Sequence, residues 1–382
     1  MIWSVLDKRL TELFAECSHL LATVEKIEVV EELGQYREWV VDEISKLQAD
    51  AQDLVVVVSH RYFDTLPEIR SAIQQRRRQL KLLRDRLVGP LARSRPDDRM
   101  TLQILGWLHG STKATRNITF AVADGPFSTW PFLTQVAVYF GPMSGASDIR
   151  HKSLFCHEFG HVLYASRARQ LDVRVGQLQK AIEAELTPRS VRNDARSHAE
   201  LRSREKIVRI WYQWSQEFFC DAVGLTIAGP SYLNAFSSHL QLLGVGDFPS
   251  HEDFDGSTHP PTRLRIELLV ERARRLELAV DSGNVLQEWE EISSSVGFDD
   301  DYLGFFTSGM SAAVHACVDD MLLICEPYRF TPADLEPCSV GEIAASNPIR
   351  LMNTAWHIYE RNHEEFRVWE QGCARHFVAD AV

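Results

Sequence analysis

The stretch HEFGH, from His157 to His161, carries the residue types of a catalytic metal site. An α-helix turns about 100° per residue, so two histidines four positions apart lie within about 40° of each other on one face. Both imidazoles could therefore bind one Zn²⁺ ion, with Glu158 beside them as a general base. The pattern is short enough to arise by chance in roughly one chain in a hundred of this length, so it needs support from other residues.

A catalytic zinc ion normally has three protein ligands, so the two histidines leave the site one ligand short. The segment WSQEFFCDAVG, Trp214 to Gly224, places Glu217 and Asp221 four residues apart on one face of an expected helix. Two acids at this spacing usually belong to a solvated face, but the apolar residues around them predict burial. We expect Glu217 to bind the metal and Asp221 to accept the free ring N–H of a ligating histidine.

Three motifs together resemble the gluzincin family that contains the CAAX-prenyl proteases and the bacterial heat-shock membrane proteases. They are HEFGH, then QEFFCDAVG with its glutamate fifty-six residues after His161, then STHPPTRLRI from Ser257 to Ile266. The resemblance covers roughly Ile118 to Leu269 and implies a zincin-like metallopeptidase core. The chain differs from that family because it lacks the usual transmembrane helices and carries helical regions on both sides.

The resemblance also implies roles for individual residues. It implies one Zn²⁺ ion per chain, with His157, His161 and Glu217 as ligands and Glu158 as the general base. It places His259 and Arg265 near the active site.

The chemistry expected from these residues is hydrolysis of a peptide bond by an activated water, whose proton Glu158 takes and delivers to the departing amine. His259 or Arg265 could stabilise the oxyanion. Alternatively, His259 could occupy the fourth zinc position and keep the enzyme latent. Cys156 and Cys220 are interpreted as core thiols, because neighbouring helix positions point about 100° away from the motif residues.

Two classes of function follow. The first is a zinc-dependent endopeptidase, which the helical flanks could keep latent until a signal arrives. The alternative is a non-catalytic zinc-containing protein whose helical flanks form a partner-binding module. The presence of Glu158 favours the first class, because a structural zinc site needs no general base.

The composition is that of a globular protein, with 45% hydrophobic and 25% charged residues among 382. A formal charge of −12 argues against nucleic acid as a partner. The basic run from Arg76 to Arg86 is expected to be a solvated helix face, the alternative being a partner or nucleic-acid contact. Seven scattered cysteines, without a CxxC pair, favour a cytoplasmic protein with reduced thiols. No membrane span is expected.

The hydrophobic pattern predicts a mostly helical α+β protein in three parts. Residues 1–95 form a helical N-terminal region that is regulatory or partner-binding, 96–280 the metallopeptidase core, and 281–382 a helical C-terminal region packed on the core. The expected partners are a protein or peptide substrate and a regulatory protein bound through the N-terminal helices.

A small sheet is expected before the HEFGH helix, from strands at Asn117–Asp124 and Thr134–Gly141 with a turn-prone GPFSTWP between them. An open edge on the second strand could bind an extended substrate. The segment Gly89–Arg99 has the composition of a linker. The apolar run that begins at Asp53 could be a strand or a continuing helix.

Overall fold

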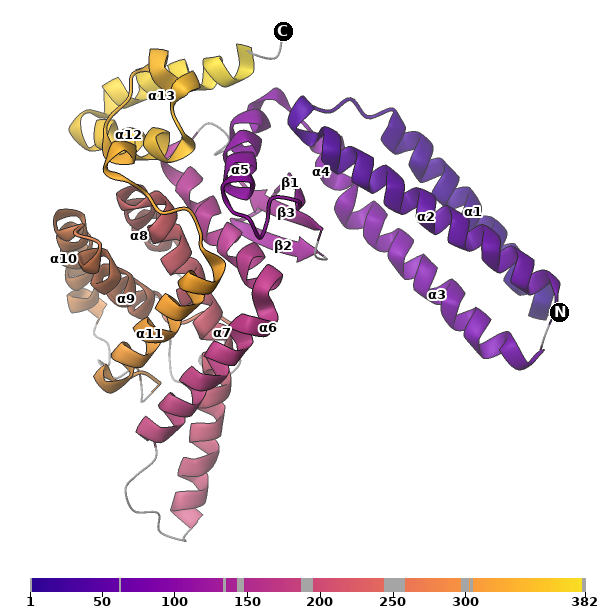
Figure 1. The fold of residues 1–382 in the computed structure, drawn as a ribbon, viewed down its shortest axis with the longest axis horizontal. Coiled ribbons are helices and arrows are strands. Elements are labelled where there is room, and N and C mark those ends of the chain that lie inside the picture. Colours follow the sequence, from indigo (N-terminus) through magenta and orange to yellow (C-terminus); the bar gives the residue numbers. More distant parts are fainter. Residues whose placement is uncertain are drawn as a thin grey trace. The chain divides into compact units, whose positions relative to one another are not determined.

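The computed structural model describes residues 2–61, 63–132, 135–142, 148–186, 195–243, 258–296, 302 and 305–379. These residues form a mostly helical α+β structure with a small three-stranded sheet, as expected (Figure 1). The chain divides into two compact units. The first comprises Met1–Gly106, Ile118–Ala146 and Phe377–Val382, and the second comprises Trp107–Asn117 and Ser147–His376. The three-part division expected from the sequence stays a prediction.

The first unit contains a bundle of three long helices, α1 (Ile2–Glu25), α2 (Gly34–Ser59) and α3 (Leu66–Leu82), which lie side by side in Figure 1. Apolar residues at spacings of three and four bury one face of each helix, because that spacing returns to the same side. On α1 the buried residues are Leu6, Leu10, Leu13, Cys17, Leu20 and Val24. The apolar run that begins at Asp53 continues α2.

Two expectations about the basic run and the linker can be compared with the structure. Arg76 and Arg77 pair with Asp50 and Glu12 at 2.9 and 2.8 Å, so part of the basic run is neutralised within the bundle. The linker interpretation of Gly89–Arg99 was wrong for its first half, which forms the short helix α4 (Gly89–Arg93). A proline fits the first turn of a helix, where its missing N–H is not needed, so the Gly-Pro pair did not exclude a helix. Helix α5 (Arg99–Ser111) follows.

The sheet has the order β1-β3-β2, with β1 (Thr119–Asp124) parallel and β2 (Ser128–Phe132) antiparallel to β3 (Val136–Gly141). The turn expected at GPFSTWP was therefore wrong, because most of it forms β2. Proline is tolerated there because β2 is an edge strand, and Pro131 lies opposite Ala137. The expected open edge on β3 was also wrong, because β3 is paired on both sides.

The second unit is centred on two long antiparallel helices, α6 (Leu154–Leu186) and α7 (Ala195–Ala228). Helix α6 runs without interruption from the HEFGH motif to Leu186. Cross-contacts establish the antiparallel order: His157 Nδ1 lies 2.9 Å from Asp221 Oδ1, and Gln179 Nε2 donates to the Val208 carbonyl at 2.7 Å. The side chains early on α6 therefore face those late on α7.

The described residues of this part of the chain form six further helices, α8 (Pro230–Leu243), α9 (Thr262–Arg275), α10 (Ala279–Val296), α11 (Ser308–Cys325), α12 (Pro348–Arg361) and α13 (His363–Ala379). Helices α8, α9, α11 and α12 pack against α6 or α7, and α10 packs against α8 and α9. Residues 244–257, between α8 and α9, lie outside the described residues. By length and composition α11 is the one described helix that could cross a membrane. It packs against α6 and α7, and its Asp319 pairs with Arg272 at 2.8 Å, as in the core helix of a globular unit.

Gly160 sets how closely α6 and α7 approach. A Cβ atom at this position would lie 2.8 Å from the Cys220 Cα atom and 3.0 Å from its sulfur. These contacts are closer than van der Waals packing allows, so any larger residue would push the two helices apart. Gly176, on the same helix, has open space where its Cβ would be.

We predict opposite effects for the same substitution at these two glycines. Gly160→Ala should lower the free energy of unfolding by about 1–3 kcal/mol, because a backbone atom must move to accept the methyl group. Gly176→Ala should raise it by roughly 0.5–1 kcal/mol, because alanine is the better helix former and meets no neighbour. Urea unfolding followed by circular dichroism measures both. Equal shifts in the two variants would contradict the close approach at Gly160.

Candidate metal centre

The first turns of α6 present the two histidines of HEFGH on one buried face. Their ring centroids lie 5.0 Å apart, and His157 and Glu158 are 8% and 6% exposed. Helical spacing of four residues brings the two imidazoles together, as expected from the sequence. Cys156 and Phe159, between and beside them, are fully buried in the core.

Helix α7 brings a carboxylate to both histidines. Glu217 Oε2 lies 3.5 Å from His157 Nε2, and Glu217 Oε1 lies 3.6 Å from His161 Nε2. Two ligand atoms in a tetrahedral zinc site with bonds of about 2.0–2.1 Å are about 3.3 Å apart. Each imidazole therefore faces one oxygen of the same carboxylate, and two imidazoles with a carboxylate are a donor set that a common metal ion can use.

The hydrogen bonding of Glu217 supports the same conclusion. Its Oε2 atom is buried and has no hydrogen-bond partner among the described residues. Arg265 Nη2 lies 3.2 Å away, outside hydrogen-bond geometry. The Arg265 ion pair offsets part of the charge of this oxygen, and a bound metal ion would satisfy the hydrogen-bonding position that remains open. The donor set and this oxygen fit a metal ion.

Cys220 also belongs to the group. The ligand atoms of His157, His161 and Cys220 all lie within 4.8 Å of one another, so these three buried or half-buried residues could hold a metal ion. The expected core position of Cys220 agrees with its complete burial. Burial and the nearby Glu217 and Asp221 carboxylates raise the pKa of the Cys220 thiol well above its usual value, which disfavours the thiolate needed for metal binding.

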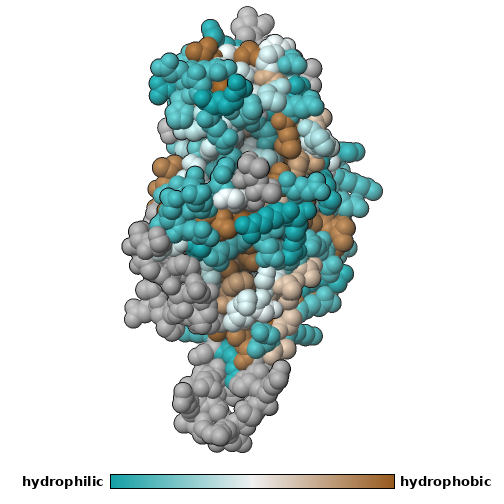
Figure 2. All heavy atoms as spheres, turned by 90° about the vertical axis from the view of Figure 1, so that its left-hand side faces the viewer, coloured by the Kyte–Doolittle hydropathy of each residue, from teal (hydrophilic) through white to brown (hydrophobic). Residues whose placement is uncertain are grey.

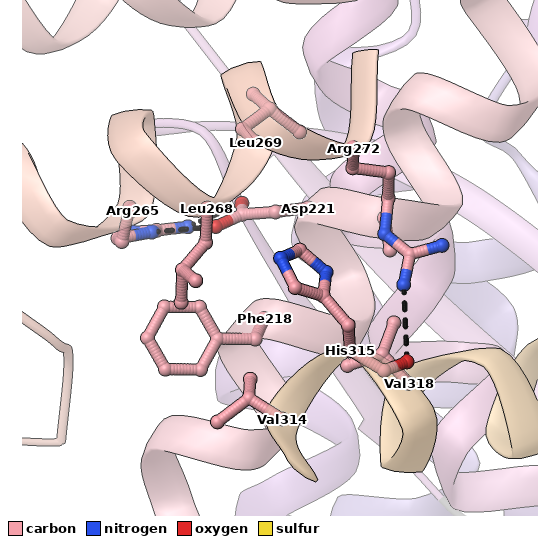
Figure 3. A pocket seen from close by; sticks show the side chains of 10 residues that line it. Phe218, Asp221, Arg265, Leu268, Leu269, Arg272, Val314, His315 and Val318 are labelled. Atoms are coloured by element: carbon pink, nitrogen blue, oxygen red, sulfur yellow. Dashed lines mark hydrogen bonds and ion pairs between the residues drawn. The ribbon is translucent and has the colours of Figure 1, made fainter. Parts of the chain in front are cut away.

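Asp221 holds the side chains around the centre in place. Its Oδ1 atom lies 2.9 Å from His157 Nδ1, so the ring can donate from Nδ1 and direct Nε2 toward Glu217. Arg265 donates to both Asp221 oxygens, at 2.9 and 2.7 Å, and Figure 3 shows this pair between α7 and α9. Tyr232 donates its hydroxyl to Asp221 Oδ1 at 2.9 Å. All four groups are buried.

A small cavity of about 20 Å³ adjoins this pair (Figure 3). Figure 3 shows His315 and Arg272 on its wall, opposite Arg265. Arg272 donates to the His315 carbonyl at 3.4 Å and to Asp319 at 2.8 Å. Helix α11 therefore contacts α9 through Arg272, on the same helix as Arg265, which binds Asp221.

The carboxylates distinguish the two histidines electrostatically. Burial opposes protonation of His157, but the hydrogen bonds and charges of Asp221 and Glu217 outweigh it and raise its pKa to about 10. Burial lowers the pKa of His161 to about 4, with the His157 charge acting in the same direction. Burial raises the pKa of Glu158 to about 7. Burial alone would raise the pKa of Glu217, but the nearby His157 ring and the Arg265 charge outweigh it, so this pKa is lowered.

His259 lies at the open side of the centre. Its side chain is 64% exposed, and its Nε2 atom lies 3.7 Å from Glu217 Oε1. Thr258 Oγ1 lies within 2.9 Å of its other ring nitrogen, which orients the imidazole. Every site residue expected from the sequence thus lies in one place: His157, Glu158, His161, Glu217, Asp221, His259 and Arg265.

Sequence reasoning missed two residues of the site. Tyr232 binds Asp221, and the Phe236 ring stacks on His157 with a centroid distance of 6.1 Å and an interplanar angle of 19°. The Arg265 guanidinium lies 4.7 Å from the same ring. The one available signal was Gly224, where a Cβ would lie 2.5 Å from the Tyr232 ring. A glycine in a sequence does not name the side chain that packs on it.

No family model, no curated protein and no solved structure matches this chain. The gluzincin resemblance therefore depends on the three sequence motifs.

We predict that Asp221→Ala weakens zinc binding by about 10- to 100-fold, the usual effect of losing the carboxylate that orients a ligating histidine. It should also lower stability, because Arg265 would remain buried without its main partner. Competitive chelator titration measures the affinity, and thermal unfolding measures the stability.

Asp319→Asn is the matched control, because Asp319 pairs with a different buried arginine, Arg272, and does not contact the histidines. This variant should keep the wild-type zinc affinity. An unchanged affinity in Asp221→Ala would remove Asp221 from the metal centre.

Proposed function

We propose that this protein is a zinc-dependent endopeptidase of the gluzincin type, with a zincin-like core built on α6 and α7. The observation that carries the proposal is the convergence of His157 Nε2, His161 Nε2 and the Glu217 carboxylate at 3.5 and 3.6 Å. Glu158 is buried beside this set without being part of it. A purely structural zinc site has no use for a buried carboxylate in that position.

Glu217 is the better third ligand than Cys220. Its carboxylate faces both imidazole nitrogens, and its pKa is lowered, so it is charged when metal binds. A Cys220 thiolate would add a third negative charge beside Glu217 and Asp221 inside the core. Zinc suits two imidazoles and a carboxylate and leaves one position open in such sites.

In the proposed reaction, residues of the chain transfer the proton and orient the metal ligands. A zinc ion in this set would supply an activated water and polarise the carbonyl of a bound peptide. Glu158 accepts the proton released as water attacks that carbonyl and passes it to the departing amine. Asp221 and Tyr232 keep the His157 ring in one orientation, as the contacts within 2.9 Å indicate.

Of the two residues considered for stabilising the oxyanion, His259 fits the role better than Arg265. Arg265 is buried and its guanidinium binds Asp221 through two hydrogen bonds, which suits holding the carboxylates rather than meeting substrate. His259 is exposed at the open side, where a substrate carbonyl would arrive. Regulation through the N-terminal helices and a cytoplasmic location remain predictions from the sequence.

A second candidate is a non-catalytic zinc protein, and the closeness of Cys220 to the two histidines favours it. With Cys220 as third ligand the site would resemble a structural centre. The two candidates differ in which α7 residue the metal needs, and therefore in the effect of single substitutions.

We predict that Glu158→Gln retains one zinc ion per chain but loses peptide-bond cleavage, because the substitution removes the general base and leaves the ligands. Elemental analysis gives the zinc content. Mapping of new protein termini, produced by wild type but not by the variant, identifies substrates and provides the activity assay.

Two substitutions on α7 serve as controls. Glu217→Gln should lose most of the zinc, whereas Cys220→Ser should retain it; the reverse result would favour the structural site. Wild-type turnover by Glu158→Gln, or a wild-type protein that does not take up zinc, would refute the proposed function.

His259→Ala separates two roles for this histidine. We expect kcat to fall by roughly 10²-fold or more, the effect of losing one well-placed oxyanion donor. A latent enzyme capped by His259 would instead become more active, because the substitution opens the fourth metal position. Both proteins are compared on one substrate at matched zinc occupancy. Higher activity in the variant would replace the oxyanion role by the capping role, and equal activity would exclude both.

A further inference from the structure

A groove of about 710 Å³ lies in the second unit, apart from the metal centre. Helices α8, α10 and α12 line it, with Arg150 from the short turn before α6. Its volume is within the range of ligand-binding clefts. Figure 2 shows the side of the molecule from which α10 and α12 are seen, and hydrophilic side chains cover much of it.

The lining of the groove is acidic. Glu288 and Glu291 from α10 and Glu360 from α12 contribute three carboxylates. Arg150 is the one cation among the lining residues, and its charge is already engaged. Its guanidinium lies 4.0 Å from the Tyr359 ring centre, and its Nε lies 3.4 Å from the Asp148 carboxylate. The groove therefore favours a cationic occupant.

Amide side chains of α8 hold two of these carboxylates in place. Asn234 donates to Glu360 Oε1 and Gln241 donates to Glu288 Oε2, each at 3.2 Å. Asn284 and Gln287 add two further amides on α10, and Gln287 donates to Glu291 Oε1 at 3.2 Å. Side-chain amides both donate and accept, so a wall of them can pair with the N–H and C=O groups of an extended peptide. Carboxylates fixed between amides suit lysine and arginine side chains that project from such a peptide.

Helix α8 separates the groove from the metal centre. Tyr232 and Phe236 on one face contact Asp221 and His157. Asn234, Ser238 and Gln241 line the groove from another face of the same helix, as their spacing of four and three requires. A chain bound in the groove would therefore lie one helix away from the metal centre.

We infer that this groove binds an extended, lysine- or arginine-rich segment of the protein substrate. The inference rests on the proposed peptidase function for its biological meaning, whereas binding itself needs no catalysis. The acidic groove would then select substrates by recognising a basic segment that lies away from the peptide bond that is cut.

The test is direct binding to the full chain carrying Glu158→Gln, which cannot consume the probe. The probe is a fluorescein-labelled peptide of about twelve residues that alternates lysine and serine, long enough to span the groove. Fluorescence anisotropy gives its affinity. We expect Glu288→Gln with Glu291→Gln to weaken binding by about tenfold, and added salt to weaken wild-type binding as well.

The matched control is Glu277→Gln with Glu290→Gln. Glu290 lies on α10 outside the groove lining, and Glu277 lies just after α9; both side chains are exposed. Each double variant removes two negative charges, so the net charge of the protein changes equally in both. This variant should bind the peptide like the parent protein. Equal weakening in both double variants, or none in the groove variant, would overturn the inference. So would equal binding of a peptide with glutamine in place of lysine.

Failure of the groove and failure of the peptidase give different results. If the protein neither binds zinc nor cleaves peptides, but only the groove variant binds the cationic peptide more weakly, the proposed function is refuted and the groove inference is supported. If cleavage is established and the groove variant binds normally, the groove inference falls alone. With a verified substrate that carries a basic segment, the groove variant should raise KM about tenfold and leave kcat unchanged.

Discussion

Two carboxylates buried on one face of α7 determine the organisation of the second unit. A buried charge is stable only when it is paired and hydrogen-bonded, so Glu217 and Asp221 each require partners from other helices. Asp221 has them within 2.9 Å, from His157, Tyr232 and Arg265. The nearest groups to Glu217 lie at 3.2 to 3.7 Å, and one of its oxygens has no hydrogen bond. This difference in pairing is the basis on which we propose Asp221 as a support and Glu217 as a metal ligand.

Three helices must approach closely to satisfy these carboxylates, and two glycines allow it. Gly160 lets α6 lie against Cys220 of α7, which brings the histidines to Glu217 and Asp221. Gly224 leaves room for the Tyr232 ring from α8. Arg265 then reaches Asp221 from α9, with α11 packed behind it through Arg272. The polar contacts of the centre and the apolar packing around it therefore depend on each other, because both require the short distances between these helices.

Helix α8 connects the proposed chemistry with the proposed selection of substrate. One face carries an aromatic pair, Tyr232 and Phe236, whose rings stack at a centroid distance of 5.3 Å and support the metal centre. Another face carries the amides that orient the carboxylates of the groove. A separate acidic groove would supply specificity by charge, which also raises the rate of association.

The sequence by itself determined what depends on local spacing. The pairs His157/His161 and Glu217/Asp221 share faces because a helix repeats every 3.6 residues, and apolar flanks predicted that the acids are buried. The long helices and their core stripes followed from the same periodicity. Only the tertiary structure decided which distant residues meet: that Arg265 and Tyr232 both bind Asp221, that Cys220 joins the histidines, and that β2 forms at an edge despite Pro131. These outcomes depend on contacts between segments far apart in the chain, and no local pattern encodes the distance between two helices or the strand that will lie beside another.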